Sequence, residues 1–196
     1  MILEGIVTTQ NADGTTNVSP MGPRVAGAIE CFTLRPYQTS TTYQNLKRHP
    51  YGVLHVTDDV ELLAAAAIGQ LNPPALVAVA GLNVQRLADT CRWYAFHVTL
   101  LDDSSERTTI ECETIASGRV RDFFGFNRAK HAVVEGAILA TRIGILPTEE
   151  IRSDFERLRI IVEKTAGDAE RRAWNLLADY VRAELAEAVE QGRGHV

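Results

Sequence analysis

The chain has 196 residues, of which 45% are hydrophobic, so it can bury one substantial core. Its formal charge of -5 argues against a broad nucleic-acid surface, because such surfaces are strongly basic. The longest apolar run, Leu62 to Ile68, is far too short to span a membrane, and the N-terminus lacks the features of a signal peptide, so we expect a cytoplasmic protein that binds neither nucleic acid nor membrane.

The first part of the chain is typical of short strands with two helices between them. Residues rich in Ile, Val and Thr flank a turn at 11–14, which predicts a β-hairpin over 2–9 and 16–21. Further strands are predicted over 25–34 and 52–57, with a helix over 40–48 that Pro50 stops. Asp58 and Asp59 predict the start of a second helix over 60–68, and residues 69–81 indicate an irregular segment.

The second part of the chain changes from strands to helices. Residues 92–101 and 108–121 predict a long twisted hairpin, which ends the β portion near Asp122. Small residues then recur at helical spacing from Ala129 to Gly144. A second helix is predicted from Pro147 to a left-handed cap at Gly167, and a third over 168–191. The pattern therefore predicts an α+β fold, with an antiparallel sheet or small barrel followed by about three helices.

The cysteines and histidines give little sign of metal binding. Cys31, Cys91 and Cys112 are widely spaced and lie in strand-like contexts, which favours buried reduced thiols over disulfides or a zinc site. The histidines other than His131, which are His49, His55, His97 and His195, show no ligand spacing. We therefore expect no metal.

Four consecutive hydroxyl residues stand at the start of the first predicted helix. Thr39, Ser40, Thr41 and Thr42 lie beside backbone N–H groups that have no partner within the helix, where the helix dipole is positive. With Arg35 upstream, this arrangement suits a phosphate. The alternative is that one of these residues caps the helix without any ligand.

A second candidate site lies at the start of the first C-terminal helix. Asn127 is a suitable N-cap, and Arg128, Lys130 and His131 crowd the first turn, where positive charge opposes the helix dipole. A bound anion would compensate for that charge; alternatively, the cations extend into solvent or pair with Asp122 or Glu135. His131 and Glu135 share one helical face, so Glu135 is placed to orient an imidazole that donates a proton, although a plain surface pair explains this spacing equally well.

Several motifs make the chain similar to the uncharacterised DUF447 family of flavin reductase-like split barrels. These motifs are Glu4-Gly5-Ile6-Val7-Thr8-Thr9, Asn17-Val18-Ser19-Pro20-Met21-Gly22-Pro23, Arg35-Pro36-Tyr37, Thr39-Ser40-Thr41-Thr42-Tyr43-Gln44-Asn45-Leu46, Thr57-Asp58-Asp59, Gly125-Phe126-Asn127-Arg128-Ala129-Lys130-His131-Ala132 and Glu163-Lys164-Thr165-Ala166-Gly167. The resemblance implies an antiparallel, Greek-key-like FMN-binding split barrel over residues 1–124, with a helical extension over 125–196 packed on it. It also implies a homodimer with the flavin near the subunit boundary.

The resemblance further implies which residues would contact FMN. The segment from Asn17 to Gly22 is similar to the strand along the flavin ring, with Ser19, Met21 and Gly22 as contacts. The turn from Thr39 to Thr42, together with Asn45, corresponds to the grip on the ribityl phosphate. This turn lacks Lys and Arg, so the phosphate charge must be met by Arg35, by another basic residue or by helix amides.

Two classes of function follow from these expectations. In the first, the protein is an FMN-dependent oxidoreductase that takes hydride from NADH or NADPH and passes it to a small anionic substrate. Asn127, Arg128 and Lys130 would bind this substrate, with His131 as the catalytic residue, and the family resemblance makes a pterin a candidate. In the second, the protein is a non-catalytic FMN or heterocycle carrier or sensor, or a dimeric scaffold with a vestigial site. The sequence has no Rossmann fingerprint for the nicotinamide, which would have to bind over the flavin.

Overall fold

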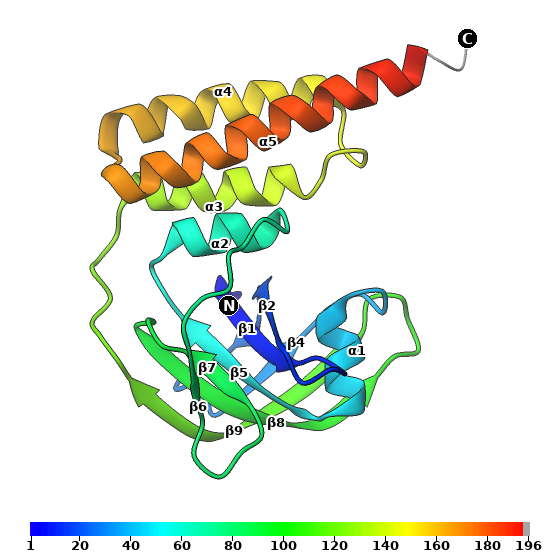
Figure 1. The fold of residues 1–196 in the computed structure, drawn as a ribbon, viewed down its shortest axis with the longest axis vertical. Coiled ribbons are helices and arrows are strands. Elements are labelled where there is room, and N and C mark those ends of the chain that lie inside the picture. The colour runs from blue at the N-terminus through cyan, green and yellow to red at the C-terminus, as the bar shows by residue number, and fades with distance from the viewer. Residues whose placement is uncertain (194–196) are drawn as a thin grey trace. The chain divides into compact units, whose positions relative to one another are not determined.

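The computed structural model describes residues 1–193, with side chains up to residue 187, and divides them into two compact units (Figure 1). The β unit consists of residues 1–58 and 73–123. The helical unit consists of residues 59–72 and the described residues from 124 onward.

A seven-stranded antiparallel sheet forms the β unit, in the order β2-β1-β5-β8-β9-β4-β3. Its strands are β1 Gly5–Gln10, β2 Thr16–Met21, β3 Arg24–Val25, β4 Cys31–Leu34, β5 Tyr51–Val56, β8 Arg92–Asp102 and β9 Thr109–Arg119. A separate pair is formed by β6 Leu76–Ala78 and β7 Gln85–Leu87. The predicted hairpins over the first strands and over β8 and β9 are confirmed.

The sheet curls far enough for the segment before β1 to reach β3 at the opposite end of the strand order. The segment before β1 pairs with the β3 edge, where the Leu3 N–H donates to the Pro23 carbonyl (3.0 Å) and the Val25 N–H donates to the Met1 carbonyl (2.9 Å). Two register shifts between β8 and β9 mark bulges, which increase the bend of long strands. The predicted fold class, an antiparallel split barrel followed by helices, is therefore confirmed.

Three local predictions in the β unit are wrong. The expected strand over 25–34 is broken into β3 and β4 by a turn in which Gly27 and Ile29 have positive φ angles of 61° and 56°. The segment expected to be irregular contains β6. Cys31 is exposed, because side chains alternate along β4 and its neighbour Phe32 takes the inward position.

The β unit buries polar groups as well as an apolar core that includes Val7, Leu54 and Phe96. His55 is fully buried, and its Nδ1–H donates to the Ile6 carbonyl (3.1 Å) while its Nε2 accepts from the Leu87 N–H (3.0 Å). Burial lowers the pKa of His55 to about 4, so the ring is neutral at pH 7. The neutral imidazole thereby ties β7 to the sheet.

Five helices complete the chain: α1 Thr41–Arg48, α2 Val60–Ala67, α3 Arg128–Ala140, α4 Thr148–Thr165 and α5 Asp168–Arg193. The helix α1 lies in the β unit, whereas α2 groups with α3, α4 and α5 in the helical unit. An ion pair between Arg172 of α5 and Glu61 of α2 (2.8 Å) is one of the contacts that hold α2 there. The three predicted C-terminal helices are confirmed.

The small residues of α3 allow close packing in the helical unit. Ala129 and Val133 are buried, and a Cβ on Gly136 would lie only 2.9 Å from the Trp174 ring, so glycine is needed at this contact. Gly144 lies beyond the end of α3 and is exposed. The predicted left-handed cap at Gly167 is wrong, because Ala166 ends α4 in an extended conformation and the Gly167 N–H donates to Glu170 Oε2 (2.9 Å).

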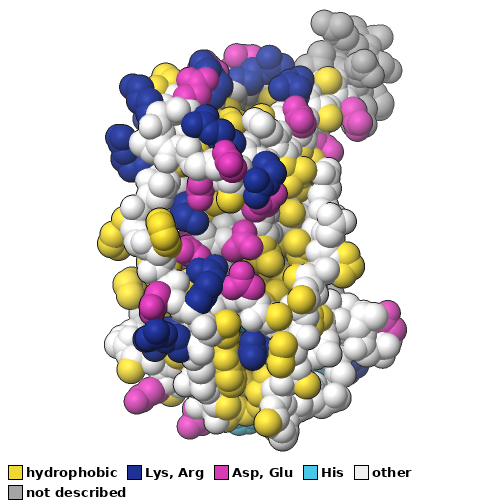
Figure 2. Space-filling model, turned by 60° about the vertical axis from the view of Figure 1, so that its left-hand side comes forward, with side chains coloured by type: hydrophobic (Ala, Val, Ile, Leu, Met, Phe, Trp, Pro, Cys, Tyr) yellow, Lys and Arg dark blue, Asp and Glu magenta, His cyan; other side chains and the backbone are white. Residues whose placement is uncertain are grey.

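The surface of the molecule carries mixed charge. On the face drawn in Figure 2, Lys and Arg side chains are interspersed with Asp and Glu. Within the described residues, no helix has the length and apolar content needed to cross a membrane.

Candidate functional site

The hydroxyl-rich turn forms the first turn of α1. Ser40 is the N-cap, since its Oγ accepts from the Tyr43 N–H (3.2 Å) and its carbonyl accepts the first helical bond, from the Gln44 N–H (3.1 Å). The N–H groups of Thr41 and Thr42 precede that first bond and have no acceptor within the helix. Thr39 and Thr41 are exposed. One residue of the cluster therefore caps the helix, and two exposed hydroxyls remain.

Strand β2 lies against this turn. The Asn17 side-chain amide donates to Thr42 Oγ1 and to Thr9 Oγ1, each at 3.3 Å. Behind it, the buried Asn45 amide donates to Thr9 Oγ1 (3.0 Å) and to Asn11 Oδ1 (2.8 Å). The structure thus brings the predicted residues Asn17, Thr42 and Asn45 together. The amide of Asn45 is taken up by hydrogen bonds within the β unit.

The other predicted ring contacts lie along β2 and just after it. Because β2 is at the edge of the sheet, one side of its backbone is not paired with a strand. Ser19 and Met21 are half-buried, and Met21 packs against the main core cluster. Gly22 is exposed, and a Cβ there would lie 3.0 Å from the Ile2 side chain.

Arg35 carries an unsatisfied donor. Its Nε is buried and has no hydrogen-bond partner among the described residues, although its carbonyl accepts from Arg107 Nε (3.2 Å). A buried guanidinium N–H without an acceptor costs free energy. An anionic group would supply that acceptor. The leading N–H groups and exposed hydroxyls of the β2–α1 face (Asn17, Ser19, Met21, Gly22, Thr39, Ser40, Thr41, Thr42 and Asn45) likewise fit a phosphate-bearing ligand.

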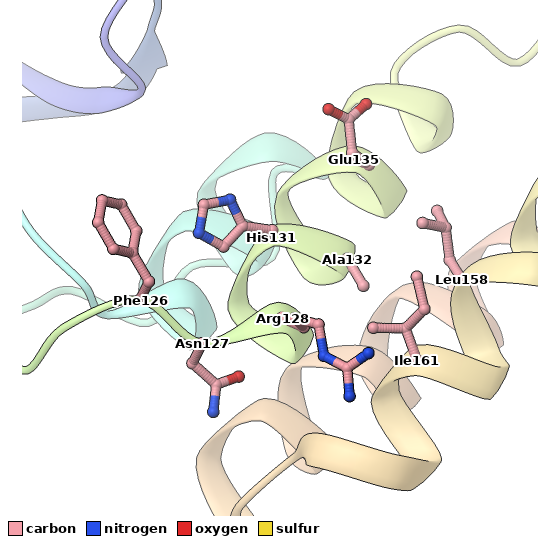
Figure 3. A pocket seen from close by; sticks show the side chains of 8 residues that line it. All are labelled: Phe126, Asn127, Arg128, His131, Ala132, Glu135, Leu158 and Ile161. Atoms are coloured by element: carbon pink, nitrogen blue, oxygen red, sulfur yellow. The ribbon is translucent and has the colours of Figure 1, made fainter.

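A cavity of about 460 Å³ lies in the helical unit, between the start of α3 and the end of α4. Figure 3 shows its lining side chains, which come from the segment before α3, from α3 and from α4: Phe126, Asn127, Arg128, His131, Ala132, Glu135, Leu158 and Ile161. We call this the α3–α4 cavity. It contains three of the residues predicted to bind or transform a substrate, but Lys130 does not line it.

The side chain of Asn127 caps the start of α3. Its Oδ1 accepts from the N–H groups of Ala129 (2.8 Å) and Lys130 (3.1 Å), which confirms the predicted N-cap. Its amide donates to the Thr165 carbonyl (3.1 Å) at the end of α4. The side chain therefore joins two helices.

Lys130 forms an ion pair with Glu170, with Nζ 3.1 Å from Oε1. Burial of Glu170 opposes its ionisation, but hydrogen bonds from Lys130 and the Gly167 N–H hold the pKa of this carboxyl below its usual value. Lys130 is thus paired with a carboxylate, as the alternative expected, but the partner is Glu170 and not the expected Asp122 or Glu135.

Arg128, His131 and Glu135 present their side chains to the cavity. Arg128 is exposed, and no ion pair to it is found among the described residues. Figure 3 shows its guanidinium extending toward α4 near Ile161, and His131 lying beside Phe126, with ring centroids 6.0 Å apart. Within the described part of the chain, no hydrogen bond joins His131 to Glu135.

Sequence reasoning missed one polar cluster in the β unit. The Arg121 guanidinium contacts Asp58 (2.6 Å) and Asp89 (2.7 Å), and it donates to Cys91 Sγ (3.2 Å). These residues are far apart in the sequence, so their spacing did not predict the cluster, although Asp58 belongs to one of the quoted motifs. Burial raises the pKa of the Cys91 thiol, which fits a structural role. Among the described residues, no group of three or more His, Cys, Asp and Glu side chains is placed to hold a metal.

Comparison with solved structures shows the fold. The chain is similar to an FMN-bound protein of Methanosarcina mazei assigned to the DUF447 family model, at 22% identity, with 91% of this chain and 94% of that chain covered and a TM-score of 0.81. It is also similar to the 2-nitrobenzoate 2-nitroreductase of Pseudomonas fluorescens (16% identity, 60% and 64% covered, TM-score 0.51). A third similar structure is an NADH:FAD oxidoreductase of Streptomyces globisporus (14% identity, 61% and 71% covered, TM-score 0.51).

Family models cover most of the chain. The model for the N-terminal domain of the proteins of unknown function DUF447 matches residues 3–121, and a second DUF447 model matches residues 127–179. No curated protein matches the chain. The protein therefore belongs to the DUF447 family, with the flavin reductase-like split-barrel fold.

Proposed function

We propose that this protein binds FMN on the β2–α1 face and acts as a flavin-dependent oxidoreductase. The observation that carries the proposal is the start of α1, which presents two leading N–H groups and the exposed hydroxyls of Thr39 and Thr41, and whose Thr42 accepts a hydrogen bond from Asn17 of β2. The buried, unsatisfied Nε of Arg35 adds a need for an anion in the same unit. The FMN-bound relative from Methanosarcina mazei supports the choice of cofactor.

The residues of this face divide into two roles. The N–H groups of Thr41 and Thr42, with the positive end of the α1 dipole, bind the phosphate, and Arg35 supplies the full positive charge that the turn lacks. The free backbone edge of β2 at Ser19 and Met21, with Gly22 just after the strand, lies along the flavin ring, where a glycine permits close approach and a methionine gives a polarisable contact. Asn17 joins the turn to β2 through Thr42, and Asn45 joins α1 to β1 through Thr9.

FMN supplies hydride transfer when bound, so the protein contributes binding, orientation and exclusion of water. Reduced nicotinamide is the proposed donor, which the NADH:FAD oxidoreductase among the similar structures supports. In the helical unit, we assign to Arg128 the charge that binds a small anionic ligand and to His131 a proton donated to that ligand; a pterin is one candidate. Lys130 and Asn127 maintain this turn through Glu170 and Thr165.

A homodimer is part of the proposal, since split barrels of this kind are expected to hold flavin near the subunit boundary. Light scattering on the purified protein tests it: a mass of about twice that of one chain is expected, and a monomer at micromolar concentration with FMN bound would contradict it.

A second candidate function is FMN storage or sensing without turnover. It is favoured by the composition of the residues assigned to FMN, among which Arg35 is the only ionisable side chain. Measurement of NADH oxidation separates the two: an oxidoreductase oxidises NADH with bound FMN much faster than free FMN does, whereas a carrier does not.

The experiment for the cofactor site is an FMN titration followed by flavin fluorescence. We expect micromolar binding by the wild-type protein and about tenfold weaker binding by Arg35→Gln, with the exposed Arg24→Gln as its matched control.

A second pair of variants tests the helix amides. Thr41→Pro removes the N–H as well as the hydroxyl at the first helical position, where proline is well tolerated, while Thr41→Ala removes only the hydroxyl. Thr41→Pro is expected to weaken FMN binding more than Thr41→Ala does. The absence of FMN binding, or equal affinity in all four variants, would refute the proposed site.

A further inference from the structure

The α3–α4 cavity has the size and walls of a small-molecule site. Its volume of about 460 Å³ lies within the range of about 300–1,000 Å³ that is typical of ligand pockets. Ala132 of α3 and Leu158 and Ile161 of α4 give it apolar walls, and Phe126 adds an aromatic side chain at one end. Such walls favour a ligand whose body is apolar.

The cation that the cavity offers to an anionic ligand is Arg128. Asn127 and Lys130 are already committed, the first to the cap of α3 and the carbonyl of Thr165, the second to Glu170. Arg128 has no ion pair among the described residues, and it stands on the first turn of α3, where the helix dipole already favours an anion. A planar guanidinium binds a carboxylate through two parallel hydrogen bonds.

The opposite end of the cavity is acidic. Glu135 lies seven residues after Arg128 on α3, which places the two about 10 Å apart along the helix axis. A second negative charge on the ligand would meet this carboxylate and be repelled. The cavity therefore favours a ligand with one anionic end.

We propose that the α3–α4 cavity binds a planar aromatic carboxylate. The ring contacts Phe126, Leu158 and Ile161, the carboxylate pairs with Arg128, and the Lys130–Glu170 ion pair positions the turn. The inference rests on the proposed function only in naming this molecule as the substrate; the binding itself is a property of the helical unit.

Calorimetric titration of the full chain with 2-naphthoate tests the proposal, with 2-naphthamide as a neutral probe of the same shape. We expect 2-naphthoate to bind with a submillimolar Kd, and 2-naphthamide to bind at least tenfold more weakly. Arg128→Ala should weaken 2-naphthoate about tenfold without changing the affinity for 2-naphthamide. The matched control is Arg152→Ala, on an exposed position of α4 outside the cavity, which should bind 2-naphthoate as the wild-type protein does.

A wall variant, Ile161→Asn, should weaken both probes. Unchanged binding of 2-naphthoate by Arg128→Ala, equal binding of the two probes, or no binding at all would overturn the proposal. FMN titrations of the same samples keep the two proposals apart, because loss of FMN binding with intact 2-naphthoate binding refutes only the flavin site. Thermal melts of each variant show whether a lost signal reflects unfolding.

Discussion

The β unit and the helical unit are stabilised in different ways. The β unit buries several polar side chains, among them Thr9, Asn45 and His55, and satisfies them with specific hydrogen bonds. In the described part of the helical unit, Glu170 is the single buried polar side chain, and the core consists of alanine, other aliphatic side chains and aromatics such as Phe155 and Trp174. The same residue types in a sequence can therefore mean structural support in one unit and an available site in the other.

The starts of α1 and α3 show this difference most clearly. Both helices have a capped N-terminus, through Ser40 and Asn127. At α1, Ser40 and Thr42 are taken up by internal bonds, which leaves Thr39 and Thr41 exposed and uncharged. At α3, Lys130 is taken up, which leaves a charged Arg128 facing a cavity. We assign the phosphate to the first and the carboxylate to the second.

The largest effect expected from the comparison of the two units is the pH dependence that the buried His55 gives to stability. Its pKa is about 4 when folded and about 6.5 in an unfolded chain, so the unfolded state binds the proton first as the pH falls. Above about pH 6.5, His55 therefore does not lower the free energy of unfolding. Between pH 6.5 and pH 4, its titration lowers the free energy of unfolding by about 3 kcal/mol.

Urea unfolding of the wild-type protein and His55→Gln at pH 7 and pH 4 measures this loss. Glutamine can both donate to Ile6 and accept from Leu87 without titrating. Protonation of carboxylates at low pH lowers the stability of both proteins. The difference between the wild-type protein and His55→Gln therefore isolates the effect of His55. Identical pH profiles would show that the ring is not held neutral.

A smaller effect is expected at Asn45. Its truncation to alanine removes hydrogen bonds to Thr9 and Asn11 and leaves buried groups unsatisfied, so we expect a loss of about 2 kcal/mol in the free energy of unfolding. The exposed Asn72→Ala should stay within about 0.5 kcal/mol of the wild type. Equal values for the two variants in urea denaturation would mean that the network is not structural.

Removal of the two helix caps, at Ser40 and Asn127, should lower the free energy of unfolding by amounts that differ by about 1 kcal/mol. Ser40→Ala removes one cap bond, for which about 1 kcal/mol is typical. Asn127→Ala removes two cap bonds and the bond to Thr165, so about 2 kcal/mol is expected. Thermal melts of the two variants, followed by circular dichroism, measure the ranking, and a larger shift for Ser40→Ala would contradict it.

The smallest effect has the opposite sign. Because Arg128 opposes the α3 dipole, Arg128→Ala should stabilise the ligand-free protein by about 0.3–1 kcal/mol at low salt, and added salt should reduce the gain. Arg152→Ala, in the second turn of α4, should show no such gain, because the dipole effect is confined to the first turn of a helix. Destabilisation by Arg128→Ala would indicate that this side chain supports the fold rather than a ligand.

The sequence allowed much of this structure to be predicted where local rules decide the outcome. Periodicity and capping residues were enough for α1, α2 and the three C-terminal helices, and turn residues were enough for the β1–β2 and β8–β9 hairpins. The turn between β3 and β4 escaped prediction because Ile29 adopts a positive φ that its residue type disfavours.

Prediction of the site was limited by contacts distant in sequence. The hydroxyl cluster and the cationic turn were identified, but Glu170 as the partner of Lys130 lies 40 residues away and follows no helical spacing. The apolar walls of the α3–α4 cavity include Leu158 and Ile161, which come from a different helix than Arg128. The sequence predicted that both residues lie in a helix, but it gave no sign that they line a cavity. Tertiary packing decides both features.

The most direct measurement is a crystal structure of the protein grown with FMN. The account predicts the phosphate at the N–H groups of Thr41 and Thr42, with Arg35 Nε donating to it or to a bridging water, and the flavin ring along β2. A phosphate bound instead at Arg128 on α3, or a flavin that does not touch β2, would contradict the account and would give the cationic turn the role assigned here to the hydroxyl-rich one.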